Sequence, residues 1–281
     1  MPSSAPNDKR HGSPTLAKLS TKGAVSGNFF PWREWLSGMR TGVKAGIKEW
    51  GAELLFPRKC VGCDRGETFL CEDCQRKIPR KASQNCPSCL SVDTPFGQTC
   101  LRCSKKYALD GVLSATSFQD NPILQEAVHV FKYEFVEELA HPLGMLLGDV
   151  VRASDMPLPD RLIPVPLHPL RERFRGFNQS ALLADILAAE IALELLSVDK
   201  NLLVRHRFTL PQARSKNKQA RKDNLEGAFR LSQAEGAAKS VRGKTFWLID
   251  DVATTGATLE ACARVLKEHG AKKVFGIVVA R

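Results

Sequence analysis

The stretch KTFWLIDDVATTGAT, from Lys244 to Thr258, sets the fold class of this chain of 281 residues. Phe246 to Ile249 form a continuous apolar run, which predicts a strand buried on both faces of a parallel sheet. Asp250 and Asp251 follow directly, and a turn rich in Thr and Gly leads into the amphipathic stretch ATLEACARVLKEHG. This order of strand, acidic pair, loop and helix predicts an α/β fold, with a parallel sheet flanked by helices.

The loop after this strand has the chemistry of a sugar-phosphate site. Open α/β sheets bind ligands at the carboxyl ends of their strands, and a helix amino terminus there offers N–H groups and a positive dipole to a phosphate. Gly256 allows the backbone to approach closely, and the Thr hydroxyls add donors. Two carboxylates would repel a phosphate, so they are better suited to a sugar diol. The alternative is that the acids only cap the helix, but a cap needs one acid and no Thr-Thr-Gly loop.

The segment IDDVATTGAT resembles the signature of the type I phosphoribosyltransferases. In that family the two acids hold the ribose 2′ and 3′ hydroxyls of phosphoribosyl pyrophosphate (PRPP), and the loop holds the 5-phosphate. By position, the resemblance assigns the diol to Asp250 and Asp251. The loop residues to which it assigns the phosphate are Ala253, Thr254, Thr255, Gly256, Ala257 and Thr258.

Four CxxC pairs predict metal binding in a module that spans residues 59–106. Each CxxC turn presents two thiolates and tetrahedral Zn²⁺ takes four, so the pairs suffice for two structural sites. Pairing of neighbours is one arrangement; crossed pairing, a single site, free or redox-active thiols and an iron–sulfur cluster are the alternatives. The cysteines are Cys60, Cys63, Cys71, Cys74, Cys86, Cys89, Cys100 and Cys103.

Two segments precede this module, and we expect the first of them to carry no chemistry. Residues 1–30 are small and polar, which favours a disordered tail, and residues 31–58 have the pattern of an amphipathic helix. That helix suits peripheral contact with a membrane surface or docking on its own protein. The net charge of +11 lies mainly upstream of residue 107. Without a signal-peptide core or a transmembrane segment of ~18 apolar residues, we expect a cytoplasmic protein with reduced thiols.

The remaining residues, 107–281, have the alternating pattern of one α/β domain, which we expect to keep its fold without metal. Asn121 is the expected cap of a helix that begins at Pro122. The predicted strands are Gly111–Phe118, a short strand that ends at Val165, Asn201–Arg205 and Val274–Val279, and the predicted helices are Pro122–Lys132, Val136–Arg152 and one from about Asn178.

Three arginines follow the strand that ends at Val165. Arg171, Arg173 and Arg175 occupy alternate positions in a predicted loop. Guanidinium groups bind anions bidentately and keep their charge, so these residues suit the pyrophosphate of PRPP. A solvated basic turn is the alternative.

A second basic stretch runs from Arg205 to Arg230, with eight Lys or Arg against two acids. Long polar segments inside compact α/β domains are typical of functional lids, so we expect a flexible loop over the site. Its candidate residues are Arg205, Gln212, Arg214, Arg221 and Asn224.

The order of the motifs resembles the ComF family of competence-associated, phosphoribosyltransferase-like proteins. The similarity covers about residues 54–281 and rests on the CxxC module, FKYE, PVPLHPLRERFRGFNQS, RHRFTLPQARSKNKQARKDNLEGAF and IDDVATTGAT. It implies a link to the uptake or use of external DNA, with DNA-uptake proteins as partners. The leading hypothesis is a Mg²⁺-dependent phosphoribosyltransferase. The alternatives are an accessory protein that binds single-stranded DNA and a regulator that senses PRPP without turnover.

Overall fold

The computed structural model describes residues 58–281, apart from residues 82, 120, 192–195, 209–224 and 226. The predicted tail of residues 1–30, nearly all of the amphipathic helix at 31–58 and most of the flexible loop therefore lie outside the described residues. Within the described residues, no helix combines the length and the apolar character that a membrane span needs.

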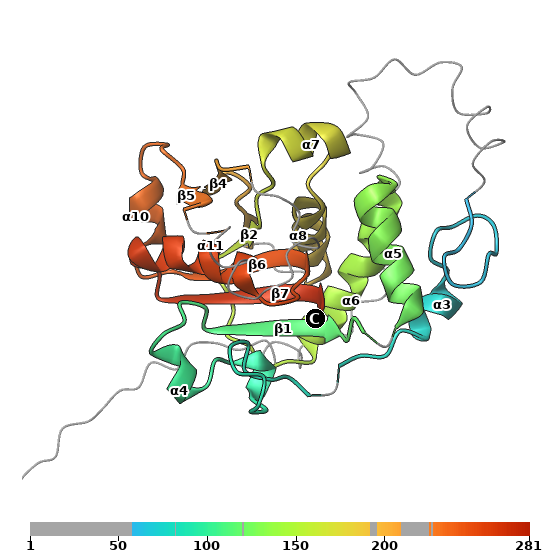
Figure 1. Ribbon diagram of the computed structural model, residues 1–281, viewed down its shortest axis with the longest axis horizontal. Helices are drawn as coiled ribbons and strands as arrows, with labels where there is room; N and C mark the ends of the chain where they lie inside the picture. Colours follow the sequence, from blue (N-terminus) through green and yellow to red (C-terminus); the bar gives the residue numbers. More distant parts are fainter. Residues whose placement is uncertain (1–57, 82, 120, 192–195, 209–224, 226) are drawn as a thin grey trace, which may run out of the picture.

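The core of the protein is a parallel sheet with the strand order β1-β7-β6-β2-β3 (Figure 1). The central strand β6 contains the run from Phe246 to Ile249, whose four side chains are fully buried. This burial on both faces confirms the parallel α/β sheet that the apolar run predicts. The strands are β1 (Gly111–Thr116), β2 (Arg161–Pro164), β3 (Ser197–Val198), β6 (Thr245–Val252) and β7 (Lys273–Ala280).

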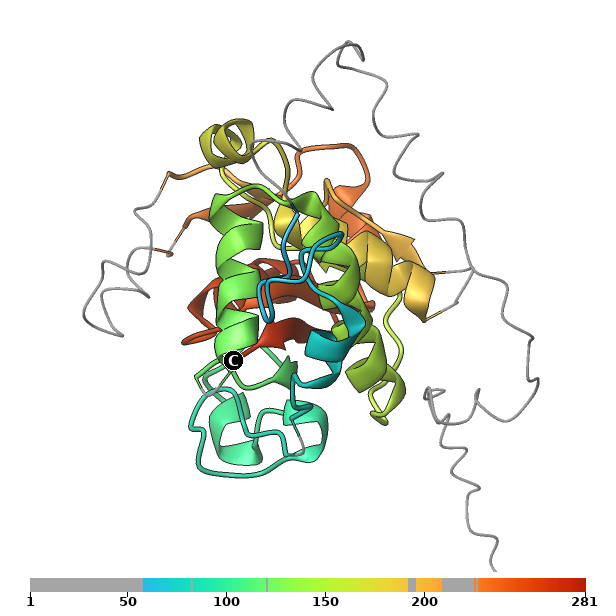
Figure 2. The ribbon, with the colours of Figure 1, turned by 90° about the vertical axis from the view of Figure 1, so that its right-hand side faces the viewer.

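Helices cover both faces of the sheet (Figures 1 and 2). Trp247 and Ile249 share one hydrophobic cluster with α5 (Pro122–Tyr133), α6 (Ala140–Arg152) and α8 (Gln179–Glu190). Phe246 and Leu248 share the other cluster with α11 (Ala257–Glu268). Side chains alternate between the faces of a strand, so neighbours on β6 supply two separate cores.

The predicted opening of α5 is confirmed. Asn121 Oδ1 accepts a hydrogen bond from Leu124 N at 3.0 Å, and Pro122 occupies the first helical position. Asn178 caps α8 in the same way, through Ser180 N at 3.0 Å. Both caps satisfy N–H groups that the first helical turn leaves without a partner.

Several elements differ from the sequence-based expectation. The arginine segment is not a loop but the helix α7 (Pro169–Arg175), with Pro at its first turn and Gly176 at its end in a left-handed conformation, φ 83°. The strand β4 (Leu203–Arg205) is outside the main sheet and pairs antiparallel with β5 (Phe229–Leu231), which was not predicted. The other short elements are η3 (Glu137–Leu139), α10 (Ala237–Val241), α3 (Glu72–Arg76), η2 (Pro95–Gly97) and α4 (Leu101–Ser104).

The two cysteine segments contact the α/β domain in different places (Figure 2). Cys60 and Cys74 belong to the hydrophobic cluster of α5, α6 and α8. The second segment lies along the outer edge of β1, where the Gln84 amide donates to Ser114 O at 2.9 Å and accepts from Ser114 N at 3.2 Å. At Ser114 this side chain takes the place of a neighbouring strand and satisfies part of an otherwise open sheet edge.

Candidate functional site

Asp250 and Asp251 lie at the carboxyl end of the central strand. β2 ends at Pro164 opposite Ile249, so the two acids extend beyond β2 on that side, while β7 continues beside them. The segment that follows β2 leads to α7, and the segment that follows β6 leads to α11. The edge of the sheet where the acids lie is therefore the one at which open α/β folds bind ligands.

Each carboxylate is held by the protein through one oxygen. Asp250 Oδ1 accepts from Ser180 Oγ and from Asp251 N, both at 3.0 Å. Asp251 Oδ1 accepts from Val252 N at 2.6 Å and forms an ion pair with Lys132 Nζ at 2.9 Å. Among the described residues, no such contact reaches Oδ2 of either acid. Two fixed carboxylates, each with one oxygen left over, can accept two hydrogen bonds from a vicinal diol.

The charges of the pair are coupled to Lys132. Burial, and then the neighbouring Asp251, raise the pKa of Asp250 to about 7, while Lys132 opposes this increase. Burial lowers the pKa of Lys132, but Asp251, together with Asp250 and Tyr133, outweighs burial and leaves that pKa above its ordinary value. Lys132 therefore stays charged, and Asp250 changes its charge near neutral pH.

The loop between β6 and α11 has the backbone of an anion-binding turn. Gly256 caps the helix at φ 71°, a left-handed conformation that glycine adopts without strain. Thr255 Oγ1 accepts from Ala257 N at 3.4 Å, and Thr254 is exposed. The first turn of α11 presents N–H groups and the positive end of the helix dipole to this loop. A phosphate fits this place beside the acids.

The helix α7 separates the three predicted arginines into a partly buried pair and one exposed residue. Arg171 and Arg175 are partly buried one turn apart, whereas Arg173 is exposed. The Arg175 guanidinium lies over the Tyr133 ring at 5.7 Å and donates to Gln179 Oε1 at 2.9 Å. The Arg171 guanidinium lies 5.6 Å from the Phe208 ring. Burial, and then Arg175, lower the pKa of Arg171. Two neighbouring cations in a partly buried position favour a polyanionic ligand.

Arg205 is a buried residue of β4 and not part of a mobile loop. Only 6% of it is exposed, and its guanidinium lies over the Phe229 ring at 5.3 Å. Burial, and then Arg171, lower its pKa, which Asp250 opposes. Arg205 is therefore close enough to both Arg171 and Asp250 for their charges to affect its pKa. The other four loop candidates, Gln212, Arg214, Arg221 and Asn224, lie outside the described residues.

Sequence reasoning did not assign Lys132, Tyr133 or Ser180 to the site. Lys132 and Tyr133 end α5, and Ser180 lies in the first turn of α8. The available signal was the FKYE segment, which lies where one predicted helix ends and the next begins and which combines a cation with aromatic rings. Only the packing of α5 and α8 against β6 brings these side chains to the acids.

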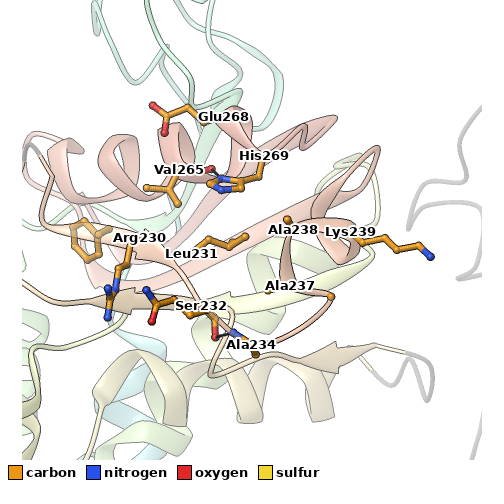
Figure 3. Close-up of a pocket in the computed structure, with 13 residues that line it drawn as sticks. Arg230, Leu231, Ser232, Ala234, Ala237, Ala238, Lys239, Val265, Glu268 and His269 are labelled. Atoms are coloured by element: carbon orange, nitrogen blue, oxygen red, sulfur yellow. Dashed lines mark hydrogen bonds between the residues drawn. The ribbon is translucent and has the colours of Figure 1, made fainter.

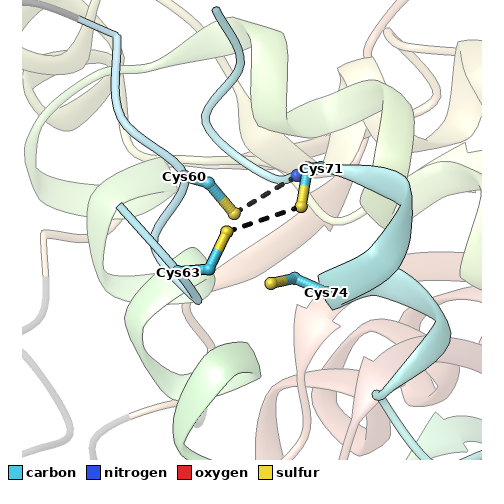
Figure 4. A group of neighbouring side chains, drawn as sticks. All are labelled: Cys60, Cys63, Cys71 and Cys74. Carbon is cyan, nitrogen blue, oxygen red and sulfur yellow. Dashed lines mark hydrogen bonds between the residues drawn. The ribbon is translucent and has the colours of Figure 1, made fainter. Parts of the chain in front are cut away.

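The eight paired cysteines form two groups of four neighbours. In each group the Sγ atoms lie within 4.8 Å of one another, which suits a tetrahedral Zn²⁺ ion. Figure 4 shows the first group, in which Cys71 N donates to Cys60 Sγ at 3.3 Å. The structure therefore supports pairing of neighbours in the sequence and not crossed pairing. The groups are Cys60, Cys63, Cys71 and Cys74, and Cys86, Cys89, Cys100 and Cys103.

A cavity of about 650 Å³ lies elsewhere, between β5, α10 and the end of α11 (Figure 3). Arg230, Lys239 and His269 are among the residues that line it, and none of the predicted site residues is. Because α11 is about 18 Å long, this cavity is most of a helix length from the loop at Gly256. It is therefore separate from the site at the acids.

Comparison with known proteins agrees with this geometry. The phosphoribosyl transferase domain family matches residues 178–281. The DNA utilization protein YhgH of Salmonella typhi is 33% identical over 213 residues, which cover 73% of this chain and 87% of that protein. Competence protein F of Haemophilus influenzae is 29% identical over 228 residues, 78% and 95% of the two chains. Competence protein ComFC of Bacillus subtilis is 26% identical over 209 residues, 72% and 79% of the two chains.

Proposed function

The chain belongs to the ComF family of proteins with a phosphoribosyl transferase domain, and from this premise we propose that it binds PRPP and transfers its phosphoribosyl group. The observation that carries the proposal is the acidic pair, in which each carboxylate is fixed at Oδ1 and has no contact at Oδ2 with any residue that the structure describes. Its relatives are named for competence and for DNA utilization, so we place the reaction in the use of external DNA by a cytoplasmic protein.

Each part of PRPP has a matching group in the site. Asp250 and Asp251 accept hydrogen bonds from the ribose hydroxyls, and residues 253–258 with the amino terminus of α11 hold the 5-phosphate. Arg171 and Arg175 bind the pyrophosphate. As the bond from C1 to pyrophosphate breaks, negative charge grows on the leaving group, and the two guanidinium groups stabilise it there. The protein thereby acts mainly by orientation and charge.

Two metals fit the donor sets of the protein. Carboxylate and phosphate oxygens are the ligands that Mg²⁺ prefers, so Mg²⁺ would bind with PRPP near Asp250 and Asp251 and offset the charge of the pyrophosphate. The thiolate groups suit structural Zn²⁺, because four sulfurs leave no open coordination position.

The test is calorimetric titration with PRPP and Mg²⁺. In the double variant D250N/D251N, two charge-assisted acceptors of about 1.5–3 kcal/mol each are lost, so affinity falls at least tenfold. D185N is the matched control, because Asp185 pairs with Lys200 on the surface. Unchanged binding by the double variant would refute the site. Pyrophosphate release with candidate bases then separates a transferase from a regulator that only senses PRPP.

A second candidate function is binding of single-stranded DNA, which exposed rings near the site favour. Tyr133 is 55% exposed, Phe174 79% and Phe208 51%, and Phe135 contacts Phe174 at 5.7 Å between ring centroids. Aromatic rings among arginines stack nucleobases without regard to sequence. Titration of the same samples with an oligothymidine strand at several salt concentrations distinguishes this function, because strand binding weakens steeply with salt.

A further inference from the structure

Lys132 reaches the acidic pair from a part of the chain that lies far from it in sequence. It ends α5, which follows β1 at the edge of the sheet, whereas Asp251 lies on the central strand. Its side chain is 22% exposed and that of Asp251 is 8% exposed, and the Nζ to Oδ1 distance is 2.9 Å. Exposed ion pairs contribute little to stability, but a shielded pair has a strong effect on its own charges.

Adjacent carboxylates in a shielded place repel each other, so one of them tends to take up a proton. A cation in contact with one acid reduces this repulsion. The charged and titratable groups around the pair are Lys132 and Tyr133 of α5, Arg205 of β4 and Cys262 of α11. Arg205 adds a second positive charge near Asp250, and Lys132 forms the direct ion pair.

We propose that Lys132 is a positioning residue of the sugar site that acts through Asp251. Its ammonium group holds Asp251 Oδ1, so Oδ2 stays available to a ribose hydroxyl, and its charge allows both acids to be ionised side by side. This inference rests on the proposed function, because it assumes that the pair accepts hydrogen bonds from a diol.

The same turn of α5 also supports the pyrophosphate side of the site. Tyr133, the next residue, lies under the Arg175 guanidinium. Ser180, one residue after the Gln179 that binds Arg175, donates to Asp250. The end of α5 and the start of α8 therefore connect the acids to the arginines through short contacts.

The experiment compares PRPP affinity at two pH values in K132M, K132R and the control K200M, which removes a surface ion pair. In K132M the affinity falls about tenfold at pH 6.5 and about threefold or less at pH 8.5, since without the cation a larger fraction of the pair is protonated at low pH. K132R keeps the charge and restores most of the binding, and K200M behaves as the wild type. In the D251N background, K132M adds less than about twofold, since the two residues act as a unit.

A second measurement needs no ligand. The carboxyl ¹³C signal of Asp250 is titrated by NMR in the wild type and in K132M, and its midpoint moves upward by about half a pH unit or more without the lysine. An unmoved midpoint, or an equal loss of PRPP affinity at both pH values, would show that Lys132 has only a structural role. If the wild type does not bind PRPP, the proposed function fails, and the NMR titration still decides whether Lys132 controls the charge of the pair.

Discussion

Asp250 has a charge that the folded protein disfavours and that the proposed diol contact requires. Its pKa of about 7 lies well above the ordinary value for Asp because of burial and Asp251. A raised pKa in the folded state means that protonated Asp250 favours folding, and that this stability is lost as pH rises from the ordinary pKa through about 7. Binding groups are often kept at such a cost to stability.

The variant D250N tests this cost. Asn cannot ionise, so the stability of D250N relative to the wild type should rise by about 2–3 kcal/mol from pH 5 to pH 8. Urea unfolding of both proteins at each pH measures the difference in their stability. The titration of the cysteine groups affects both proteins equally, so it cancels in this difference. D185N, which removes the ion pair with Lys200 outside the site, should show no such gain in stability as the pH rises. A constant difference between wild type and D250N would contradict the raised pKa.

At the scale of the element, helix formation by α7 decides which arginines can share a ligand. Successive residues of a helix are about 100° apart, so Arg171 and Arg175 lie within about 40° of each other around the axis and Arg173 points about 160–200° away. Exposure agrees, because Arg173 is exposed and the other two are partly buried. An extended loop would have aligned all three.

We therefore expect different effects from the three arginines. R171A and R175A should each weaken PRPP and pyrophosphate binding about tenfold and leave ribose 5-phosphate binding nearly unchanged, because each removes a charge-assisted contact to pyrophosphate. R173A, on the opposite side of the same helix, is the matched control and should bind all three ligands normally. Calorimetry with the three ligands gives the comparison. Equal losses in all three variants would mean that α7 acts only as a general positive surface.

At the scale of the whole molecule, the two cysteine groups make unequal contributions to the core. Cys60 and Cys74 are fully buried within the cluster that contains α5, α6 and α8. Cys103 is partly exposed, and its segment covers the edge of β1. Because of this shared core, we expect loss of metal from the first group to lower the stability of the α/β domain more than loss of metal from the second.

Metal analysis and thermal unfolding test whether the two cysteine groups contribute unequally to the stability of the core. We expect about two zinc ions per chain, with one lost in C74S and one in C103S, because zinc binding and local folding are coupled. The melting temperature should fall by about 5 °C more in C74S than in C103S, since only C74S disturbs the main core. C262S, at the buried cysteine outside both groups, should keep both zinc ions. Equal melting temperatures for C74S and C103S would mean that the first group is as peripheral as the second.

The sequence by itself determined the parts of this protein that depend on neighbouring residues. An apolar run followed by Asp250 and Asp251 specifies a buried strand with acids at its end, and the Thr-Gly turn specifies the start of α11. CxxC spacing likewise brings two thiols together within one turn. These features are local, because side-chain periodicity and turn geometry span only a few residues.

Only the tertiary structure decided what surrounds the acids. The strand order places β6 between β7 and β2, and packing against it brings Lys132 and Ser180 from separate helices to the two carboxylates. Burial of Arg205 and the pairing of β4 with β5 likewise depend on contacts between distant segments. The segment PLRERFR has too few apolar residues for a helical period to be recognised in it. Pro169, Gly176 and packing therefore decide that this segment forms a helix and not a loop. Such choices follow from the whole chain, because contacts between elements outweigh weak local preferences.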